Sequence, residues 1–288
     1  MESAAEILRE YGPFSDAEKV HGVTFDGRHV WFASGDRLNA FDPASGKLVR
    51  TIAVPAYAGT AFDGRHLFQI AEDRIQKIDP HTGRVVATIP GPGGSDSGLA
   101  WAEGTLWVGQ GRGRKIHQID PQTGAILRTI ECNRVVTGVT WVDGELWHGT
   151  WTGDESDLRR IDPRTGEVLD RLEMPAGMGV SGLESDGGER FFCGGGSSGK
   201  VRAIRRPRAR QRGRQRCQDR RAASRSVFRL IGIRNAQGRA REGTISGSAG
   251  RVSRISNSPA ACDANLGLRF ANPPRRFDPR SGREAFRL

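Results

Sequence analysis

One carboxylate stands out among the residues that could do chemistry, because it interrupts a repeated row of small side chains. A short glycine-led phrase occurs five times in the chain, and its third residue is in turn Thr24, Ala61, Ala100, Thr140 and Glu184. Burial among apolar neighbours raises the pKa of a carboxyl group, because it disfavours the charged form. Glu184 is therefore a candidate general acid or base. The alternative is a structural ion pair, with Arg134 or Lys200 as the partner.

Two other polar residues and one aromatic residue also depart from the repeat. Gln69 and His148 stand where the other copies have apolar residues, namely Phe32, Val108 and Phe192. We predict His148 as a second catalytic residue and Gln69 as a substrate contact, and the alternative for this His is a hydrogen-bonded packing role. Trp151 falls outside the aromatic register. It is predicted to lie in a loop, where it forms either a wall of the ligand site or a cover over the core.

These residues are positioned by a repeat with a period close to forty residues. Its copies begin at Gly22, Gly59, Gly98, Gly138 and Gly182, which are separated by 37, 39, 40 and 44 residues. Each copy continues into an apolar run, and four of them reach a turn of the form Asp-Pro-x-Ser/Thr-Gly, ending at Gly46, Gly83, Gly124 and Gly166. A period of this length with two turn signals per copy is typical of a four-stranded propeller blade. We therefore predict an all-β, five-bladed β-propeller over residues 1–207.

The two ends of the repeat complete each other. The fifth copy supplies three strands, the last of them near Lys200–Ile204, and has no fourth. Ile7–Tyr11 resembles the segments that close the other copies, although Glu2–Tyr11 could also begin a helix. An N-terminal strand that completes the last blade closes the ring and removes two open sheet edges. We predict that Ile7–Tyr11 pairs with the strand near Val201.

The order of strands in a blade places the loops on two faces of the ring. The Asp-Gly hairpins and the Asp-Pro turns share one face, and their uniform sequence predicts a structural role. The loops between second and third strands and between blades share the other face and differ from blade to blade. Binding residues concentrate on such varied loops around a rigid scaffold, so this face, where the loops converge on the central channel, is the predicted site. Its predicted substrate contacts are Trp151, Gln69, His21, Asp96, Arg134 and Lys200.

No metal or cofactor is predicted. Asp154, Glu155 and Asp157 could bind a hard cation, but the segment lacks the glycine of an EF-hand loop, and a solvated acidic loop is the simpler interpretation. Gly194–Lys200 has the composition of a phosphate-binding loop but lacks the Ser or Thr that follows its lysine. No His and Cys residues have the spacing of a zinc site.

The last part of the chain differs from the rest. Residues 1–201 contain 21 Lys and Arg against 28 Asp and Glu, whereas residues 202–288 contain 23 Arg, no Lys and 5 acidic residues. Such a composition buries too little apolar surface to offset its chain entropy, so we predict a disordered basic tail at residues 208–288. The absence of Lys favours out-of-frame or fused sequence, although Phe277–Gly282 repeats the turn phrase. Nucleic acid is expected to bind only non-specifically, through this tail.

The remaining features predict where the protein is found. The chain starts without a basic segment followed by an apolar one, so a secretory signal is not predicted. No apolar run approaches the roughly 18 residues of a membrane helix. The four Cys lack a C-x-x-C spacing, as in a reduced protein without a disulfide framework. We predict a cytoplasmic monomer without membrane contact.

Several segments together resemble a known family. Val20–Gly27, Ile78–Pro80, Thr137–Trp141 and Leu146–Trp151 are similar to the small bacterial propellers grouped with the glutamine cyclotransferases, which share quinoprotein-type propeller repeats. The similarity covers residues 5–207. It implies a five-bladed propeller, and the plant-type glutaminyl cyclases of this group cyclise an N-terminal glutamine to pyroglutamate with loss of ammonia. The chain departs from the family at Val20–Gly22, where the first blade ordinarily begins with Thr-Gln-Gly.

The resemblance implies roles for the candidate residues. Cyclisation needs a carboxyl group to move a proton, donors to hold the amide and an aromatic slot. Glu184 would supply the carboxyl, Gln69 or His148 the donors, and Trp151 the aromatic wall. The predicted protein binds a small polar or peptide-like ligand at the central channel and, as a transferase, cyclises N-terminal glutamine. The alternative is a non-catalytic propeller that serves as a scaffold for a ligand or a protein.

Overall fold

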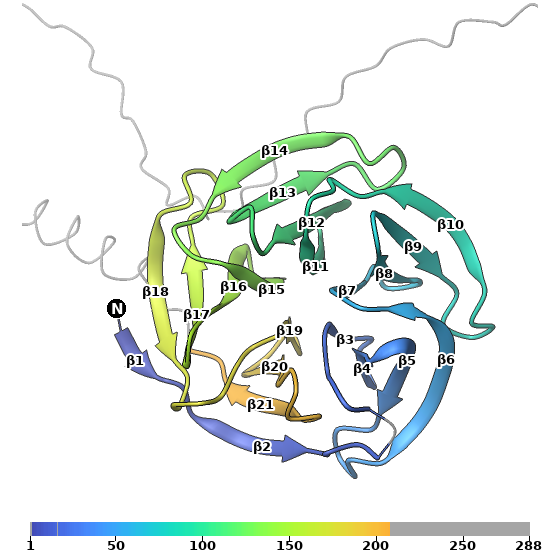
Figure 1. Cartoon of the computed structure of the whole chain (residues 1–288), viewed down its shortest axis with the longest axis horizontal. Coiled ribbons are helices and arrows are strands. Elements are labelled where there is room, and N and C mark those ends of the chain that lie inside the picture. The colour runs from blue at the N-terminus through green and yellow to red at the C-terminus, as the bar shows by residue number, and fades with distance from the viewer. Residues whose placement is uncertain (1, 16, 208–288) are drawn as a thin grey trace, which may run out of the picture. The chain divides into compact units, whose positions relative to one another are not determined.

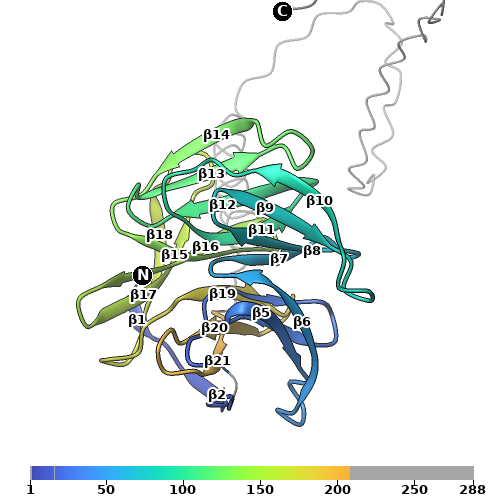
Figure 2. The same cartoon turned by 45° about the vertical axis from the view of Figure 1, so that its right-hand side comes forward.

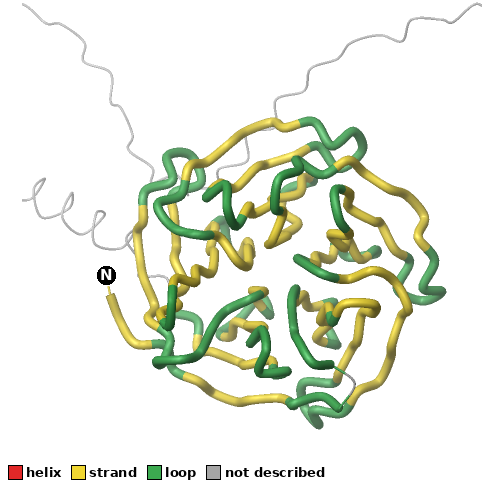
Figure 3. The backbone as a smooth tube through the Cα atoms, in the orientation of Figure 1, coloured by secondary structure: helices red, strands yellow, loops and turns green. Residues whose placement is uncertain are grey.

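The computed structural model describes residues 2–15 and 17–207 of the 288-residue chain. The predicted tail at residues 208–288, with its turn phrase at Phe277–Gly282, lies outside the described residues. The described part contains 21 β-strands and no helix, and its strands form five sheets around a common centre (Figures 1 and 3). The prediction of an all-β, five-bladed propeller is confirmed. None of the described residues belongs to a helix that could cross a membrane.

Each blade runs outward from an inner strand near the centre of the ring (Figure 1). Blade 1 consists of β3 (Val23–Phe25), β4 (Val30–Ala33), β5 (Gly35–Phe41) and β6 (Leu48–Ala56). Blade 2 consists of β7 (Thr60–Phe62), β8 (Leu67–Ala71), β9 (Arg74–Ile78) and β10 (Val85–Pro90). Blade 3 consists of β11 (Asp96–Ala102), β12 (Thr105–Gln110), β13 (Lys115–Ile119) and β14 (Ile126–Glu131). Blade 4 consists of β15 (Val136–Val142), β16 (Glu145–Thr152), β17 (Glu155–Ile161) and β18 (Val168–Glu173).

The fifth blade joins the two ends of the ring. It contains β19 (Gly182–Ser185), β20 (Arg190–Gly194), β21 (Val201–Arg205) and, as its outer strand, β2 (Ile7–Tyr11). Strands β2 and β21 are antiparallel, with Ile7 opposite Ile204 and Tyr11 opposite Val201. They lie side by side in both views (Figures 1 and 2). The predicted closure is therefore confirmed, and the alternative of an N-terminal helix is wrong.

The N-terminus also contributes a strand that the sequence did not reveal. Strand β1 (Glu2–Ala4) pairs in parallel with β18 and becomes a fifth strand on the outer edge of blade 4. Glu2 lies opposite Arg171, and the two side chains form an ion pair. A three-residue strand carries no periodicity of its own, so its position depends on this neighbouring edge.

Aromatic rings and aliphatic side chains fill the spaces between blades. Phe68 of blade 2 stacks on Trp101 of blade 3 with 5.4 Å between ring centroids, and Trp107 of blade 3 stacks on Trp141 of blade 4 at 5.3 Å. The buried apolar residues form five clusters, one for each pair of adjacent blades. Burial of apolar surface in these clusters stabilises the ring rather than any blade alone.

A ring of glycines lets the inner strands approach one another. Gly22, Gly59, Gly98, Gly138 and Gly182 each face the backbone of the next inner strand. A Cβ atom added at Gly138 would lie 2.4 Å from the backbone nitrogen of Leu183, and one added at Gly182 would lie 2.6 Å from the carbonyl oxygen of His21. These five residues, called the ring glycines below, have no space for a side chain, so the strands would have to separate to accept one.

We predict that Gly138→Ala destabilises the propeller by about 1–3 kcal/mol or more, because the added methyl group overlaps backbone that cannot move independently of its sheet. The matched control is Gly111→Ala, where the nearest atom to an added Cβ is 3.7 Å away. Urea denaturation of both variants measures the difference. Equal denaturation midpoints for the two variants would show that the close approach does not constrain the ring.

Candidate functional site

The mouth of the central channel on the varied face contains a cavity of about 250 Å³. Its wall includes the residue that precedes each ring glycine, namely His21, Ala58, Ser97, Thr137 and Ser181. Because these five positions come from all five blades, the cavity lies around the channel axis. Asp96 and Trp151 also line it, so three of the predicted contacts, His21, Asp96 and Trp151, lie at one place.

Asp96 brings a carboxyl group to this cavity from the start of β11. The Gln110 side-chain amide donates to Asp96 Oδ1 at 3.1 Å, and the Gly93 backbone N–H donates to Oδ2 at 3.3 Å. Burial raises the pKa of Asp96 above its ordinary value, and these hydrogen bonds offset only part of the increase. Each carboxylate oxygen has a further lone pair, so Asp96 can accept a proton or a donor from a ligand.

Trp151 contributes an aromatic ring to the lining of the cavity. It belongs to β16, so the prediction that it lies in a loop is wrong. Its indole N–H donates to the Gly153 carbonyl oxygen at 2.8 Å, and 40% of its surface remains exposed. The ring lies against Gly179, where an added Cβ would be 3.1 Å from the indole, so a glycine is needed there for this close contact. An exposed indole held in one orientation can cover an apolar or cationic part of a ligand.

His21 also lines a second hollow of about 540 Å³ on the same face, beside the β4–β5 turn of blade 1. The side chain is half-buried. Burial, and then the charge of Lys19, lower the pKa of His21 below its ordinary value. Its imidazole is therefore neutral at neutral pH and can both donate and accept a hydrogen bond.

Glu184 lies two residues beyond Gly182 on β19, further along the channel than the cavity wall. The Thr140 hydroxyl donates to its Oε1 at 2.5 Å, and the Thr24 hydroxyl donates to its Oε2 at 2.8 Å. The Ser185 backbone N–H also donates to Oε1, at 2.8 Å. Glu184 thus joins blade 5 to both of its neighbours, and the predicted alternative of an ion pair with Arg134 or Lys200 is wrong.

The surroundings of Glu184 favour its protonated form. Although part of its surface remains accessible from the channel, the carboxyl group is deep within the ring, and this burial raises its pKa to about 7. The hydrogen bonds from Thr140, Ser185 and Thr24 act in the opposite direction and are too weak to cancel it. A carboxyl group with this pKa can exchange a proton near neutral pH.

Gln69 and His148 are buried inside their blades and do not reach the cavity. Gln69 accepts a hydrogen bond from the Thr60 hydroxyl at 2.6 Å and donates to the Ile70 carbonyl oxygen at 2.8 Å. His148 is 1% exposed, and its Nδ1 lies 3.2 Å from the Gly149 carbonyl oxygen. Burial lowers the pKa of His148 to about 4, which favours a neutral packing residue. Their predicted roles in substrate binding and catalysis are therefore corrected, because no ligand can touch either side chain in this structure.

Arg134 and Lys200 do not line the cavity at the mouth. Arg134 pairs with Glu155 at 3.1 Å and with Asp157 at 3.3 Å, and Lys200 pairs with Glu10 at 2.9 Å. Burial opposes the charge of Asp157, but hydrogen bonds led by that of Arg159 outweigh it and lower its pKa to about 2. The carboxylates of Glu155 and Asp157 are thus already paired with arginines. Within the part of the chain that the structure describes, no three His, Cys, Asp or Glu residues are grouped so as to hold a metal ion.

Several residues that line the mouth were not predicted from the sequence. They are Tyr57, Ser97, Thr137 and Ser181. Three of the four immediately precede a ring glycine, and Tyr57 lies two residues before Gly59. The signal was therefore present in the repeat, because the residue before the glycine must face the channel mouth if the glycine itself contacts the next blade.

We predict that Glu184→Gln removes a pH-dependent loss of stability. The folded-state pKa of about 7 is above the ordinary value of 4.5, so the folded protein binds the extra proton. The stabilisation from this proton is complete below pH 4.5 and is lost as the pH rises to about 7. The loss is about 1.4 kcal/mol for each unit by which the folded-state pKa exceeds the unfolded-state pKa. The variant should match the unsubstituted protein at pH 5 and exceed its free energy of unfolding at pH 8.

Denaturation at several pH values measures this difference. The control is Glu167→Gln, which changes an exposed carboxyl group and should leave the pH dependence unchanged. Parallel stability curves for the unsubstituted protein and Glu184→Gln would contradict the assignment of the raised pKa to Glu184.

The chain is similar to several solved structures. The structure of glutaminyl cyclase from Myxococcus xanthus matches with a TM-score of 0.61 and 19% sequence identity, covering 71% of this chain and 97% of that chain. Hydrazine synthase from Kuenenia stuttgartiensis matches with a TM-score of 0.42 and 19% identity, covering 62% and 56% of the two chains. The WD40 propeller domain of Doa1 matches with a TM-score of 0.44 and 17% sequence identity, covering 65% of this chain and 63% of that chain. At 19% identity the likeness to the Myxococcus xanthus structure shows the fold alone.

Sequence comparison adds the family. No curated protein matches the chain. The PQQ_2 family model, described as outer membrane protein assembly factor BamB, matches residues 71–240, which is more than half of the chain. Together with the fold shared with glutaminyl cyclase, this match confirms the predicted resemblance to glutamine cyclotransferase-like propellers with quinoprotein-type repeats. The chain therefore belongs to the PQQ_2 family of propeller proteins, the family described as outer membrane protein assembly factor BamB.

Proposed function

We propose that the channel mouth binds the first residue of a peptide and cyclises an N-terminal glutamine with release of ammonia. One observation carries the proposal: all five blades contribute to a single small cavity that combines a partly buried carboxyl group with an exposed indole. Such a site suits a ligand with an amine at one end and a carbon chain next to it. The shared fold of the Myxococcus xanthus glutaminyl cyclase supports the choice of reaction.

The reaction requires little more than positioning and one proton carrier. The α-amine of the glutamine attacks its own side-chain amide carbon, a ring C–N bond forms, and the bond to the amide nitrogen breaks. The proton lost by the attacking amine must reach the leaving nitrogen, which departs as ammonia. Products and reactants then balance without water or a cofactor.

Asp96 is the proton carrier in this proposal. It lines the cavity, its pKa is raised by burial, and both of its oxygens keep acceptor capacity. Glu184 lies further along the channel and its carboxyl group is held by two threonine hydroxyls, so it supports the inner strands instead. Trp151 covers the methylene groups of the glutamine, and neutral His21 contacts the polar end.

We predict that the full chain releases ammonia from a Gln-initiated dipeptide and that Asp96→Asn slows release by about 10²–10⁴-fold, the usual contribution of a general acid or base. Trp151→Ala should mainly raise KM, because it removes binding surface. A coupled assay for ammonia measures both rates. The control is Asp73→Asn, an exposed carboxyl group in the β8–β9 turn on the same face, which should leave the rate unchanged.

Two outcomes would contradict the proposal. One is the absence of ammonia release from folded protein, and the other is release that Asp96→Asn and Asp73→Asn affect equally. Release that depends on Glu184 but not on Asp96 would return the catalytic role to the carboxyl group first predicted.

A non-catalytic scaffold is the second candidate, and a specific observation favours it. Exposed aliphatic pairs begin the outer strands of three blades, at Leu48–Val49, Val85–Val86 and Ile126–Leu127. Exposed apolar residues that recur around a ring can support contact with another protein. The family description as an assembly factor agrees with such a role. Folded protein that releases no ammonia would favour this candidate, and the cytoplasmic, monomeric state stays a prediction in either case.

A further inference from the structure

We propose that a second site, on the hairpin face between blades 1 and 2, binds a small anion that carries a planar ring. The site is a cavity of about 680 Å³ lined by residues of the two Asp-Gly hairpins, of β6 and of the β9–β10 turn. It lies on the face opposite the channel mouth, so it is independent of the proposed cyclisation. The uniform sequence of the turns on this face predicted a purely structural role.

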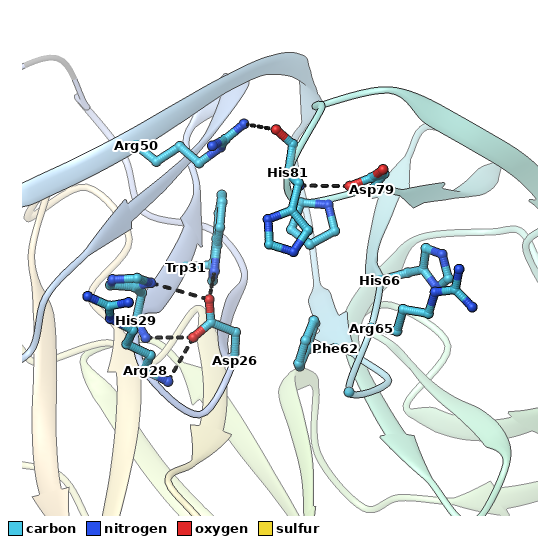
Figure 4. Close-up of a pocket in the computed structure, with 12 residues that line it drawn as sticks. Asp26, Arg28, His29, Trp31, Arg50, Phe62, Arg65, His66, Asp79 and His81 are labelled. Carbon is cyan, nitrogen blue, oxygen red and sulfur yellow. Dashed lines mark hydrogen bonds and ion pairs between the residues drawn. The ribbon is translucent and has the colours of Figure 1, made fainter.

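A motif that occurs in only two blades builds this cavity. Asp-Gly-Arg-His appears at Asp26–His29 in blade 1 and at Asp63–His66 in blade 2. The equivalent hairpins of the other blades contain Glu103–Thr105, Asp143–Glu145 and Asp186–Glu189 instead. A tight turn needs the Asp and the Gly but neither the Arg nor the His. Their repetition in two adjacent blades places one Arg-His pair on each side of the space, with Trp31 and Phe62 between the two pairs (Figure 4).

The acidic groups of the site are already occupied. Asp26 accepts hydrogen bonds from the His29 backbone N–H at 2.6 Å and from the Trp31 indole at 2.7 Å. Burial opposes its charge, but these hydrogen bonds together hold the pKa of Asp26 below its ordinary value. Asp79 accepts from the His81 backbone N–H at 2.7 Å. Both carboxylates therefore fix their own turns and are not directed at a ligand.

Two of the three arginines that line the cavity remain available. Among residues 2–15 and 17–207, the exposed guanidinium groups of Arg28 and Arg65 form no hydrogen bond or ion pair. Arg50 reaches across from β6 and donates to the His81 carbonyl oxygen at 2.5 Å, which orients that turn (Figure 4). Three arginines and three histidines thus line the cavity against two carboxylates. Guanidinium groups without a partner are the usual ligands of phosphate and carboxylate groups.

Flat side chains supply the rest of the lining. Trp31 of β4 and the His81 imidazole lie on opposite sides of the space, and Phe62 at the end of β7 lies below them in the view (Figure 4). Planar groups in such a position stack on an aromatic ligand. The volume is within the range of sites for small organic ligands. Aromatic phosphates and aromatic carboxylates share the chemistry that this lining recognises.

Calorimetric titration of the full chain tests the proposal, with phenyl phosphate, benzoate and inorganic phosphate as probes. We predict saturable binding of phenyl phosphate at physiological salt, about tenfold or more tighter than inorganic phosphate because the ring is also buried. The double variant Arg28→Ala, Arg65→Ala should weaken it by about tenfold or more. The side chains of both arginines are exposed, so thermal unfolding should be unchanged. Titration with benzoate shows whether the site binds aromatic carboxylates as well as aromatic phosphates.

The matched control is Arg84→Ala, which removes an exposed arginine from the β9–β10 turn outside the cavity and should leave binding unchanged. Binding that survives the double substitution would place the anion elsewhere, for example on the arginines of residues 208–288, and would overturn the proposal. Equal weakening by the control would reduce the effect to net charge. Equal affinity for phenyl phosphate and inorganic phosphate would overturn the role of the planar ring.

Discussion

The whole ring depends on how closely five inner strands can approach one another. At each ring glycine the backbone of one blade meets the backbone of the next, and any side chain there would overlap main-chain atoms. This contact fixes the width of the channel and the angle between neighbouring blades. The aromatic stacks and aliphatic clusters further out, including Phe68 on Trp101, fill the space that this geometry leaves. Packing between blades therefore follows from a constraint at the centre.

The same constraint decides which residues can do chemistry. A residue just before a ring glycine faces the mouth, as His21 and Ser181 do, whereas a residue two positions after it lies within the channel, as Glu184 does. A carboxyl group two residues after a ring glycine, such as that of Glu184, accepts hydrogen bonds from hydroxyl groups of both adjacent blades. One at the start of an inner strand, such as Asp96 in β11, remains available to a ligand. Position in the repeat thus separates a structural acid from a candidate proton carrier.

The repeat period was sufficient to predict the fold, the closure by Ile7–Tyr11 and the mouth position of His21, Asp96 and Trp151. It could not predict the partners of Glu184, because Thr24 is brought next to it only by closure of the ring. Arg134 and Lys200 were misassigned because each already pairs with a carboxylate outside the cavity lining, Asp157 and Glu10 respectively. Gln69 and His148 were misassigned for another reason. A polar residue at a position that is apolar in the other blades was predicted to contact a ligand. In the structure, backbone and hydroxyl groups inside the blade form the hydrogen bonds of both side chains.

The pairing of β2 with β21 has a consequence for synthesis of the chain. The outer strand of the last blade, β2, leaves the ribosome before the three strands that it completes, and Ile7 cannot meet Ile204 until almost the entire propeller has been translated. At about 5–20 residues per second, β2 waits for about ten seconds or longer with its hydrogen-bonding groups unmatched. Contacts between such distant positions are also slow to form, because a long loop must close first. A nascent chain that stops before Val201 would leave both β2 and β20 as open edges, the condition that favours association with other chains.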